Sequence, residues 1–312
     1  MKSVTVVGSG IVGLTSAISL QEAGFQVRLV AKERFEKTLS SKVGAIWFPF
    51  EIHPKEKTNH WATLAYERYK SEIQEGNGVA FIPFLTAFTP ESNIDWTRQL
   101  PVGKVRKARP EELPKGMQMA FISEVPLAEP QLYLPHLFER FIANGGSFEN
   151  REITSLEEMT GVDDLVINCT GLGAKSLCND KELHPMRGQI LRCKKMNFPS
   201  FANPTKRGAL SYVINRSEDS VIGGTDYEND WNESIDPADT DLILHRLTES
   251  GISQSPEILE VIVGLRPRRS AVRFEFDSHY ANVFHNYGHG GAGFTVAWGC
   301  ALELAVILKG SK

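Results

Sequence analysis

Cysteine is scarce in this sequence, and its spacing excludes two classes of site. The 312 residues include four cysteines, with no C-x-x-C pair and no histidine pair at zinc-finger distance from such a pair, so no disulfide framework and no zinc site is predicted from them. The expected environment is a reducing one. Internal repeats and low-complexity tracts are also lacking, and 41% hydrophobic with 23% charged residues is typical of a globular protein.

A dominant charge of one sign is lacking as well. Lys and Arg number 34 and Asp and Glu 38, giving a net charge of -4, and without a positive field a nucleic-acid partner is not expected. Residues 3–20 carry no charge and resemble a signal peptide or a membrane span, but glycines and hydroxyl residues interrupt them, so no membrane partner is expected. The ending Gly310-Ser311-Lys312 lacks the last residue of the peroxisomal S-K-L signal, and the expected location is the cytoplasm or the peroxisome.

A glycine motif near the start of the chain predicts a dinucleotide site. Gly8, Gly10 and Gly13 form G-x-G-x-x-G between an apolar strand at 3–7 and a helix that begins at Ile11. Such glycines allow a tight turn, a close approach of phosphate to the backbone and close packing of helix on strand, while the helix N-terminus attracts the phosphates. A purely structural glycine turn is the alternative interpretation.

A second strand at 26–31 completes a β-α-β unit. The acidic residue that binds the ribose in such units is expected just after this strand. Lys32 and Glu33 stand there, and Glu33 is the candidate ribose ligand.

Further glycine clusters favour FAD over NAD. A short apolar strand at 164–168 returns to the first sheet and runs into Thr170 and Gly171, and a glycine-rich stretch at 285–293 precedes an apolar helix at 294–308. Glycines dispersed in this way suit a cofactor that lies along the domain, with its reactive ring far from the pyrophosphate.

The middle of the chain predicts a second, mainly antiparallel sheet. Strand-like runs occur at 188–192, 212–215 and 220–224, and an amphipathic helix is expected at 61–75. The predicted fold class is α/β, a Rossmann-type FAD-binding domain interleaved with a mixed or antiparallel-sheet substrate domain. The boundaries are 1–52, 130–182 and 264–312 for the FAD-binding domain, and 53–129 and 183–263 for the substrate-binding domain.

The G-L-R-P-R-R stretch at 264–269 contains the candidate carboxylate-binding residue, Arg266. Arg266 follows an apolar strand and precedes a proline that stiffens the chain. A guanidinium held in this way can bind a carboxylate through two parallel hydrogen bonds. A solvent-exposed basic turn is the alternative.

Two histidines four residues apart, His285 and His289, could indicate a metal site. The glycines between and after them disfavour the helix that would bring both rings to one face, so no metal is predicted. Close approach of the backbone to a flat cofactor explains the glycines better.

Taken together, these motifs resemble those of the D-amino-acid oxidase family. The resemblance spans most of the chain and keeps the family order. Its motifs are G-S-G-I-V-G-L at 8–14, S-S-K-V-G-A-I-W-F-P-F at 40–50, Y-L-P at 133–135, V-I-N-C-T-G at 166–171, R-G-Q-I at 187–190, S-Y-V-I at 211–214, I-G-G-T at 222–225, G-L-R-P-R-R at 264–269 and H-N-Y-G-H-G-G-A-G-F-T at 285–295.

The resemblance implies roles for individual residues. Arg266 would pair with the substrate carboxylate, the Tyr212 hydroxyl would hydrogen-bond it, and the Gly291 carbonyl would accept from the substrate amine. Phe48, Phe50 and Asp226 would line the pocket. The predicted FAD contacts are Gly8, Gly10, Ile11, Val12, Gly13, Lys32, Glu33, Ser40, Ser41, Gly44, Ala45, Ile46, Trp47, Ile153, Thr170, Gly171, Arg266, Gly290, Gly291, Ala292, Gly293, Phe294 and Thr295, with core packing as the alternative role for Trp47.

The resemblance also implies the reaction, which is oxidative deamination of D-amino acids with noncovalently bound FAD. Hydride transfer to flavin N5 needs no proton-abstracting side chain, and oxygen as acceptor gives an imino and then a keto acid, ammonia and hydrogen peroxide. The alternatives are a glycine or sarcosine type of amine oxidase, an amino-acid dehydrogenase with another electron acceptor, and a non-enzymatic FAD-binding protein. The expected partners are a small D-amino acid and oxygen, and a homodimer is an open alternative for the assembly.

Two positions depart from the better-known members of that family. The segment at 196–211, which corresponds to a lid, is short and lacks an additional tyrosine. Asp226 stands where the D-aspartate-oxidising branch carries an arginine. A carboxylate facing the pocket would repel an acidic substrate, so neutral or basic side chains are expected to be favoured; a solvated Asp226 is the alternative.

Overall fold

The computed structural model describes residues 2–49, 51–114, 116–205, 208–252 and 254–310, and the chain forms two compact units. Unit 1 comprises Met1–Val79, Ala128–Pro185 and Arg266–Lys312, and unit 2 comprises Ala80–Leu127 and Met186–Leu265. Each unit is therefore assembled from segments that alternate along the chain. The predicted α/β fold with interleaved parts is confirmed.

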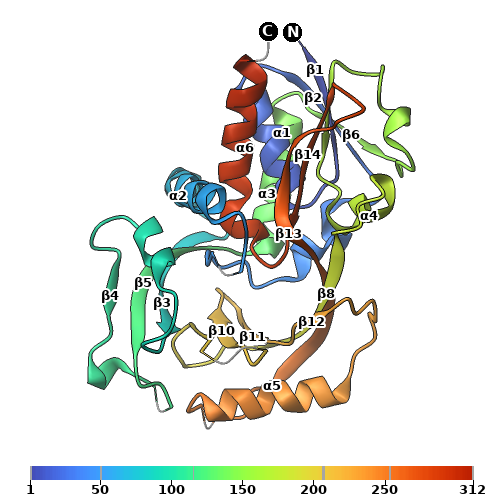
Figure 1. The fold of residues 1–312 in the computed structure, drawn as a ribbon. Helices are drawn as coiled ribbons and strands as arrows, with labels where there is room; N and C mark the ends of the chain where they lie inside the picture. The colour runs from blue at the N-terminus through green and yellow to red at the C-terminus, as the bar shows by residue number, and fades with distance from the viewer. Residues whose placement is uncertain (1, 50, 115, 206–207, 253, 311–312) are drawn as a thin grey trace. The chain divides into compact units, whose positions relative to one another are not determined.

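A parallel sheet forms the centre of unit 1 (Figure 1). Its neighbouring strands are β14 (Val283–His289), β7 (Leu165–Asn168), β1 (Ser3–Val7), β2 (Gln26–Ala31) and β6 (Ser147–Asn150), all mutually parallel, with β13 (Ile258–Phe276) antiparallel to β14. Parallel strands are covered on both faces, which explains why β1 has a nearly continuous run of buried β-branched residues. The strands predicted at 3–7, 26–31 and 164–168 are confirmed.

The long helices of unit 1 are α1 (Ile11–Glu22), α2 (Lys55–Glu72), α3 (Pro130–Ala143) and α6 (Gly293–Gly310); α4 (Ala174–Leu177) is short. The helix α6 packs against α1 and α2, and α1 packs against α3. By length and hydropathy α6 could cross a membrane, but most of it is buried in unit 1. The helix predicted at 294–308 is confirmed, and the one predicted at 61–75 begins earlier, directly after Pro54.

The predicted domain boundary at residue 52 differs from the boundary of the compact units. Residues 53–79 belong to unit 1, whereas the sequence-based division placed 53–129 in the substrate-binding part. The physical reason is the contact between α2 and α6, where a Cβ atom at Gly299 would lie 2.1 Å from the Trp61 carbonyl oxygen. The buried Trp61 and Tyr69 side chains need this cover.

Unit 2 is built on a mainly antiparallel sheet. Its strands, in spatial order, are β4 (Val105–Lys107), β5 (Ala120–Ala128), β3 (Val79–Ala87), β9 (Phe201–Asn203), β10 (Ser211–Asn215), β11 (Asp219–Gly223), β8 (His184–Lys194) and the first part of β13, and β12 (Tyr227–Glu228) pairs with β8. The pairs β4–β5, β9–β10, β10–β11 and β11–β8 are antiparallel, while β3 and β9 are parallel. The predicted antiparallel strands are confirmed, but the prediction of a separate second sheet is wrong, because these strands and those of unit 1 belong to one continuous sheet.

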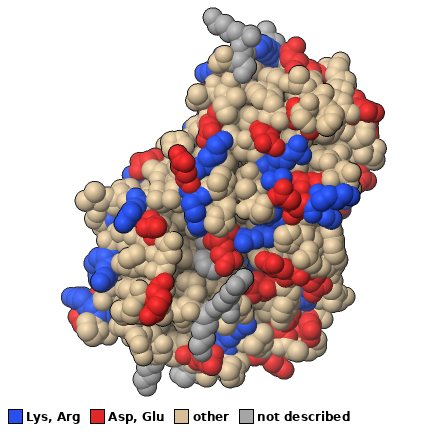
Figure 2. Space-filling view, viewed as in Figure 1, with Lys and Arg blue, Asp and Glu red and all other residues tan. Residues whose placement is uncertain are grey.

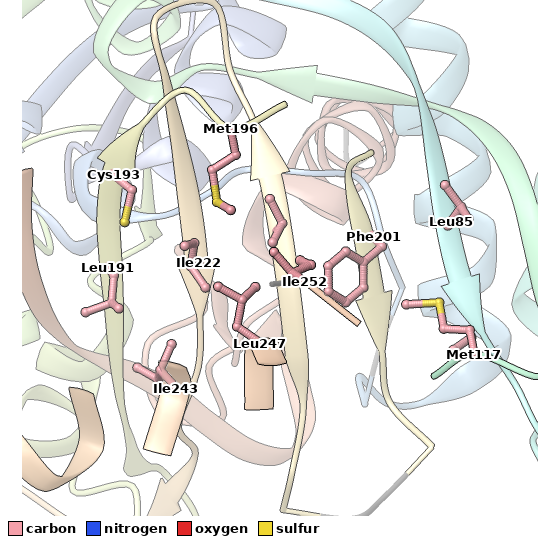
Figure 3. Packing of buried hydrophobic residues seen from close by; sticks show 12 residues of the cluster. Leu85, Met117, Leu191, Cys193, Met196, Phe201, Ile222, Ile243, Leu247 and Ile252 are labelled. Atoms are coloured by element: carbon pink, nitrogen blue, oxygen red, sulfur yellow. The ribbon is translucent and has the colours of Figure 1, made fainter. Parts of the chain in front are cut away.

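One helix, α5 (Pro237–Glu249), supplies the apolar cover of this sheet. Figure 3 shows Ile243 and Leu247 of α5 among Leu191 and Ile222 of the strands. Proline at the first turn and Asp236, whose side chain accepts from the Ala238 amide, define where α5 begins. The helix contacts β10, the strand that carries Tyr212.

Short 3-10 turns connect the longer elements. They are η1 (Phe35–Lys37), η2 (Leu39–Lys42), η3 (Asp95–Gln99), η4 (Pro110–Glu112), η5 (Leu156–Glu158) and η6 (Gly171–Gly173). All four cysteines are free thiols. Figure 2 shows positive and negative side chains interspersed over the face it presents, in keeping with the small net charge.

Candidate functional site

The glycine turn between β1 and α1 leaves no space for side chains. Gly8 has a φ of +111°, and a Cβ atom there would lie 2.4 Å from the Cys169 carbonyl oxygen. A Cβ atom at Gly13 would lie 1.8 Å from the Gly8 carbonyl oxygen. Both distances are far below contact, so only glycine permits α1 to approach β1 and β7 this closely.

The N-terminus of α1 is suited to an anion. Gly10 is the N-cap and has no side chain to cap the helix, and the first turn, Ile11-Val12-Gly13, contains no acidic residue. The Ile11 amide donates to Ser40 Oγ at 3.0 Å, so the structure brings together Gly10, Ile11 and Ser40. Ser41 lies in the same turn, where its hydroxyl donates to the Glu36 and Thr38 carbonyls.

The residues after β2 lie beside this turn. Ser9 Oγ donates to the Glu33 carbonyl at 2.6 Å, which fixes Glu33, the candidate ribose ligand, next to the glycine motif. Lys32 is exposed and lies 3.7 Å from a Glu152 carboxylate oxygen. Ile153 packs, partly buried, against the cluster that contains Val7 and Val30 at the ends of β1 and β2.

The loop after β7 is held by a residue that sequence reasoning missed. Asn168 Oδ1 accepts from the Thr170 amide at 3.2 Å and from Thr170 Oγ1 at 2.8 Å. Gly171 follows with a φ of +56° and begins η6. Thr170 and Gly171 are thus placed next to the Gly8 turn, as the contact between Gly8 and Cys169 shows. An amide side chain at the end of a parallel strand was the available signal.

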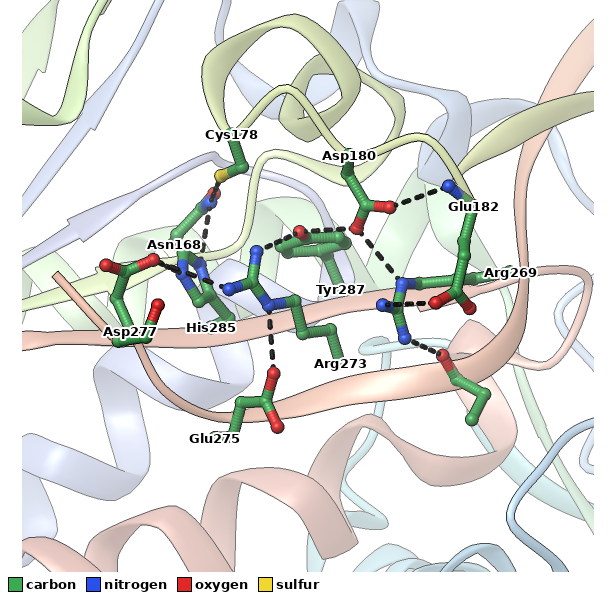
Figure 4. A network of polar contacts seen from close by, with 12 residues as sticks. Asn168, Cys178, Asp180, Glu182, Arg269, Arg273, Glu275, Asp277, His285 and Tyr287 are labelled. Atoms are coloured by element: carbon green, nitrogen blue, oxygen red, sulfur yellow. Dashed lines mark hydrogen bonds and ion pairs between the residues drawn. The ribbon is translucent and has the colours of Figure 1, made fainter.

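Asn168 is itself part of a buried polar network (Figure 4). Because its Oδ1 accepts from a backbone amide, its Nδ2 is the donor toward His285 Nδ1 at 3.2 Å. His285 Nε2 must then carry the proton that reaches Asp277 Oδ2 at 2.8 Å. Burial lowers the pKa of His285. Burial raises the pKa of Asp277, but the hydrogen bonds from His285 and two amides outweigh it and hold that pKa at about 2.

A second part of the network surrounds Tyr287. Its hydroxyl donates to Asp180 Oδ2 at 2.8 Å and accepts from Arg273 at 2.9 Å, and Arg269 Nε lies 3.0 Å from the same Asp180 oxygen. Burial raises the pKa of Tyr287. Burial raises the pKa of Asp180, but the hydrogen bond from Tyr287 and the positive charge of Arg269 outweigh this effect. The pKa of Asp180 is therefore below its ordinary value.

The arginine stretch at 264–269 lies elsewhere in the fold than predicted. The motif does not follow a strand but lies inside β13, and Arg266, Arg268 and Arg269 are all partly buried, which contradicts the alternative of an exposed turn. Arg269 pairs with Asp180, and Arg268 hydrogen-bonds the Glu51 carbonyl. These two arginines therefore anchor the chain around Arg266.

The glycine run at 290–293 connects Arg266 to the α1 turn. A Cβ atom at Gly291 would lie 3.6 Å from Arg266 Cδ, and one at Gly293 would lie 3.6 Å from Ile11 Cγ2. Gly290 has a φ of +53°, and its amide donates to the Pro267 carbonyl at 2.8 Å. The predicted carboxylate-binding and phosphate-binding residues of unit 1 are therefore neighbours of one glycine segment.

The start of α6 also holds the segment at 44–48. Thr295 Oγ1 accepts from the Phe48 amide at 3.1 Å and donates to its carbonyl at 3.2 Å. Trp47 is buried, and its Nε1 donates to the Ala62 carbonyl at 2.9 Å, which supports a packing role. Gly44, Ala45, Ala292 and Phe294 are buried, Ile46 and Phe48 are partly exposed, and Phe50 lies outside the described residues.

Two predicted substrate residues belong to unit 2. Tyr212 on β10 lies opposite Gly223 of β11, and a Cβ atom at Gly223 would lie 2.2 Å from Tyr212 Cζ. Asp226 is half-buried and stands between two anchored neighbours. Thr225 Oγ1 accepts from the Gln189 amide at 2.9 Å, and the Tyr227 hydroxyl donates to Asp239 at 2.6 Å.

His289 is expected to make the stability of the protein depend on pH. Burial lowers its pKa from 6.5 to about 4, so folding favours the neutral ring, and stability is complete above pH 6.5 and falls as the pH drops toward 4. Between pH 7.5 and pH 5 we expect about 2 kcal/mol of stability to be lost through this residue. Urea unfolding of the wild type and His289→Gln at both pH values measures it. An equal loss in the variant would contradict this assignment.

Among the described residues, no cluster of His, Cys, Asp or Glu is arranged to hold a metal.

Comparison with known proteins places the chain among flavoproteins. Residues 3–306 match the family described as FAD dependent oxidoreductase. The D-amino-acid oxidase of Rubrobacter xylanophilus is 37% identical, over 97% of this chain and 94% of that protein, and the D-amino-acid oxidase of Dictyostelium discoideum is 34% identical, over 96% and 89%. Among solved structures, L-proline dehydrogenase from P. horikoshii has the same fold, with a TM-score of 0.81 at 16% identity, over 100% of this chain and 94% of that one.

Proposed function

Since this chain belongs to the FAD dependent oxidoreductase family, we propose that it catalyses the oxidative deamination of D-amino acids. Two relatives named D-amino-acid oxidase, 34 and 37% identical over nearly the whole chain, support this substrate class. The observation that carries the proposal is the placement of Arg266 against Gly291, in the glycine segment that also reaches Ile11 at the N-terminus of α1.

The residues of unit 1 fit FAD as the cofactor. Gly8 and Gly13 form a turn that a Cβ atom would fill, and α1 begins beside it with Gly10, an N-cap residue that has no capping side chain. We assign the pyrophosphate to Gly10, Ile11, Val12 and Ser40, the ribose to Glu33, and the remaining contacts to Thr170, Gly171 and the segments at 44–47 and 290–295. When bound, FAD supplies a two-electron acceptor at its N5 atom.

Three groups would bind and orient the substrate. The Arg266 guanidinium pairs with the α-carboxylate through two hydrogen bonds, and the Tyr212 hydroxyl donates to the same carboxylate. The Gly291 carbonyl accepts from the α-amine. We assign Arg266 of this stretch to the substrate because it lies against Gly291, where a Cβ atom would come within 3.6 Å of Arg266 Cδ.

Catalysis would rest on orientation rather than on a general base. A neutral amine that is held at both its carboxylate and its nitrogen would give up hydride from Cα to the two-electron acceptor that FAD supplies, while the nitrogen lone pair forms the C=N bond. Water then hydrolyses the imino acid to a keto acid and ammonia. With oxygen as the final acceptor, the two electrons leave as hydrogen peroxide.

Asp226 is expected to disfavour acidic substrates. Its two chain neighbours, Thr225 and Tyr227, are held by hydrogen bonds to Gln189 and Asp239, and a carboxylate that faces the pocket raises the cost of binding a second one. We expect kcat/KM for D-aspartate to lie at least about tenfold below that for D-alanine, and Asp226→Asn to raise it several-fold with little change for D-alanine. Steady-state kinetics with D-alanine, D-lysine and D-aspartate measures both. If D-aspartate is the best substrate of the wild type, the carboxylate does not face the pocket.

The proposed function is tested by anaerobic mixing of the flavin-loaded protein with D-alanine, L-alanine, D-lysine, glycine and sarcosine. Loss of flavin absorbance with D-isomers alone, followed by return of colour and peroxide in air, is the expected result. Bleaching by glycine or sarcosine alone would indicate the related amine oxidase, and bleaching by D-isomers without peroxide in air would indicate a dehydrogenase. No bleaching by any D-isomer overturns the proposal.

A further inference from the structure

Arg246 of α5 joins two chain segments that flank Tyr212. Its Nη1 donates to the Gly224 carbonyl at 2.9 Å, and its Nη2 donates to the Gly208 carbonyl at 2.6 Å. Gly208 precedes β10, on which Tyr212 lies, and Gly224 follows β11. The planar guanidinium presents both donors in a fixed geometry, so it sets the separation of the two carbonyls.

The position of the Tyr212 ring depends on the backbone that Arg246 holds. The ring lies over Gly223, where a Cβ atom would come within 2.2 Å of Cζ and 2.3 Å of the hydroxyl oxygen. A Cβ atom at Gly224 would lie 3.5 Å from the same hydroxyl oxygen. The Gly224 amide also donates to the Leu210 carbonyl at 3.3 Å. A shift of the Gly223–Gly224 backbone would therefore move the hydroxyl directly.

The helix that carries Arg246 is itself fixed in unit 2. Ile243 and Leu247 are buried in the core of this unit. Ser250, the C-cap of α5, contacts the Ser211 hydroxyl at 3.3 Å and donates to the Arg246 carbonyl at 2.9 Å. At the other end, the Asp239 carboxylate pairs with the buried Arg187. A helix held at both ends is a rigid support for a side chain that positions others.

We infer that Arg246 is a positioning residue that determines how well the Tyr212 hydroxyl binds the carboxylate of the substrate. The inference rests on the proposed function, because it takes Tyr212 as a carboxylate ligand. Arg246 acts through the Gly208 and Gly224 carbonyls and does not itself contact the substrate. Its loss should weaken binding of carboxylates more than it slows turnover.

The experiment compares Arg246→Met, Tyr212→Phe and the double variant in the flavin-loaded protein. The readouts are KM and kcat for D-alanine and the Kd of benzoate, measured from the flavin spectrum; benzoate has a carboxylate but no α-hydrogen, so it binds without reacting. We expect Arg246→Met to raise KM and Kd about tenfold, with kcat within about threefold of the wild type. Both residues are proposed to act through the Tyr212 hydroxyl. The Kd of benzoate in the double variant should therefore lie within about twofold of the higher Kd of the two single variants.

Two further variants keep the test decisive. Arg246→Lys retains the charge but reaches fewer carbonyls, so it should give an intermediate Kd even if Arg246→Met fails to fold. Arg192→Met removes a partly buried arginine of the same unit, which is paired with Glu260 and Asp219, and should leave the Kd within about twofold. The inference would be overturned if the increase in Kd in the double variant equals the product of the two single increases. It would also be overturned if Arg246→Met lowers kcat and leaves KM and Kd unchanged. Wild-type protein that binds benzoate but oxidises no D-isomer would contradict the proposed function alone, and the benzoate affinities would still decide the role of Arg246.

Discussion

Replacement of Arg266 by Met is expected to lower kcat/KM for D-alanine by on the order of 10³-fold. The variant removes the guanidinium that we assign to the carboxylate, and loss of one partner of a desolvated charge pair costs about 3–5 kcal/mol. Most of the loss should appear in KM and in the Kd of benzoate, because the carboxylate is bound in both the ground state and the transition state. Steady-state kinetics and flavin titration measure the two quantities.

Arg266→Lys tests whether geometry or charge matters more at this position. A lysine keeps the positive charge but cannot form two parallel hydrogen bonds with a carboxylate, so we expect it to recover only part of the affinity. Arg98→Met, which removes an exposed arginine near Asp95, is the matched control and should behave as the wild type. If Arg266→Met stays within tenfold of the wild type, another residue binds the carboxylate.

Gly13→Ala is expected to yield protein that purifies without flavin. The added methyl group would lie 1.8 Å from the Gly8 carbonyl oxygen. Because this oxygen is a backbone atom and cannot rotate away as a side chain can, the helix must move away from the turn. An anion site made of helix N–H groups depends on that placement. We expect the Kd of FAD to rise by on the order of 100-fold, and absorbance titration of the apoprotein measures it.

Gly310→Ala is the matched control for Gly13→Ala, because it adds the same methyl group to a helical glycine that has space around it. Among the described residues, and apart from its chain neighbours and the backbone of its own helix, no atom lies within 4 Å of a Cβ at Gly310, at the end of α6, so this variant should bind FAD as the wild type does. Thermal unfolding of both variants distinguishes loss of the cofactor site from loss of the fold. A yellow Gly13→Ala protein with unchanged FAD affinity would show that the pyrophosphate lies elsewhere.

The local elements of the nucleotide-binding half could be predicted because their signals are local. The strand at 3–7, the glycines at 8–13 and the helix that follows are adjacent in the chain, and their periodicity and glycine spacing determine their conformation. The strands at 212–215 and 220–224 were predictable for the same reason. The position of α2 was not, since its assignment to unit 1 depends on contact with α6 more than 200 residues later.

The candidate site shows the same division between sequence and structure. The glycine turns, the arginine stretch and the tyrosine on β10 can be identified from the residue types and their spacing alone. The contacts of Arg269 with Asp180, of Asn168 with His285 and of Arg246 with the carbonyls beside Tyr212 become visible in the folded chain and could not be predicted. The physical reason is that burial makes each polar group find a partner, and these partners come from strands and helices that are distant in sequence.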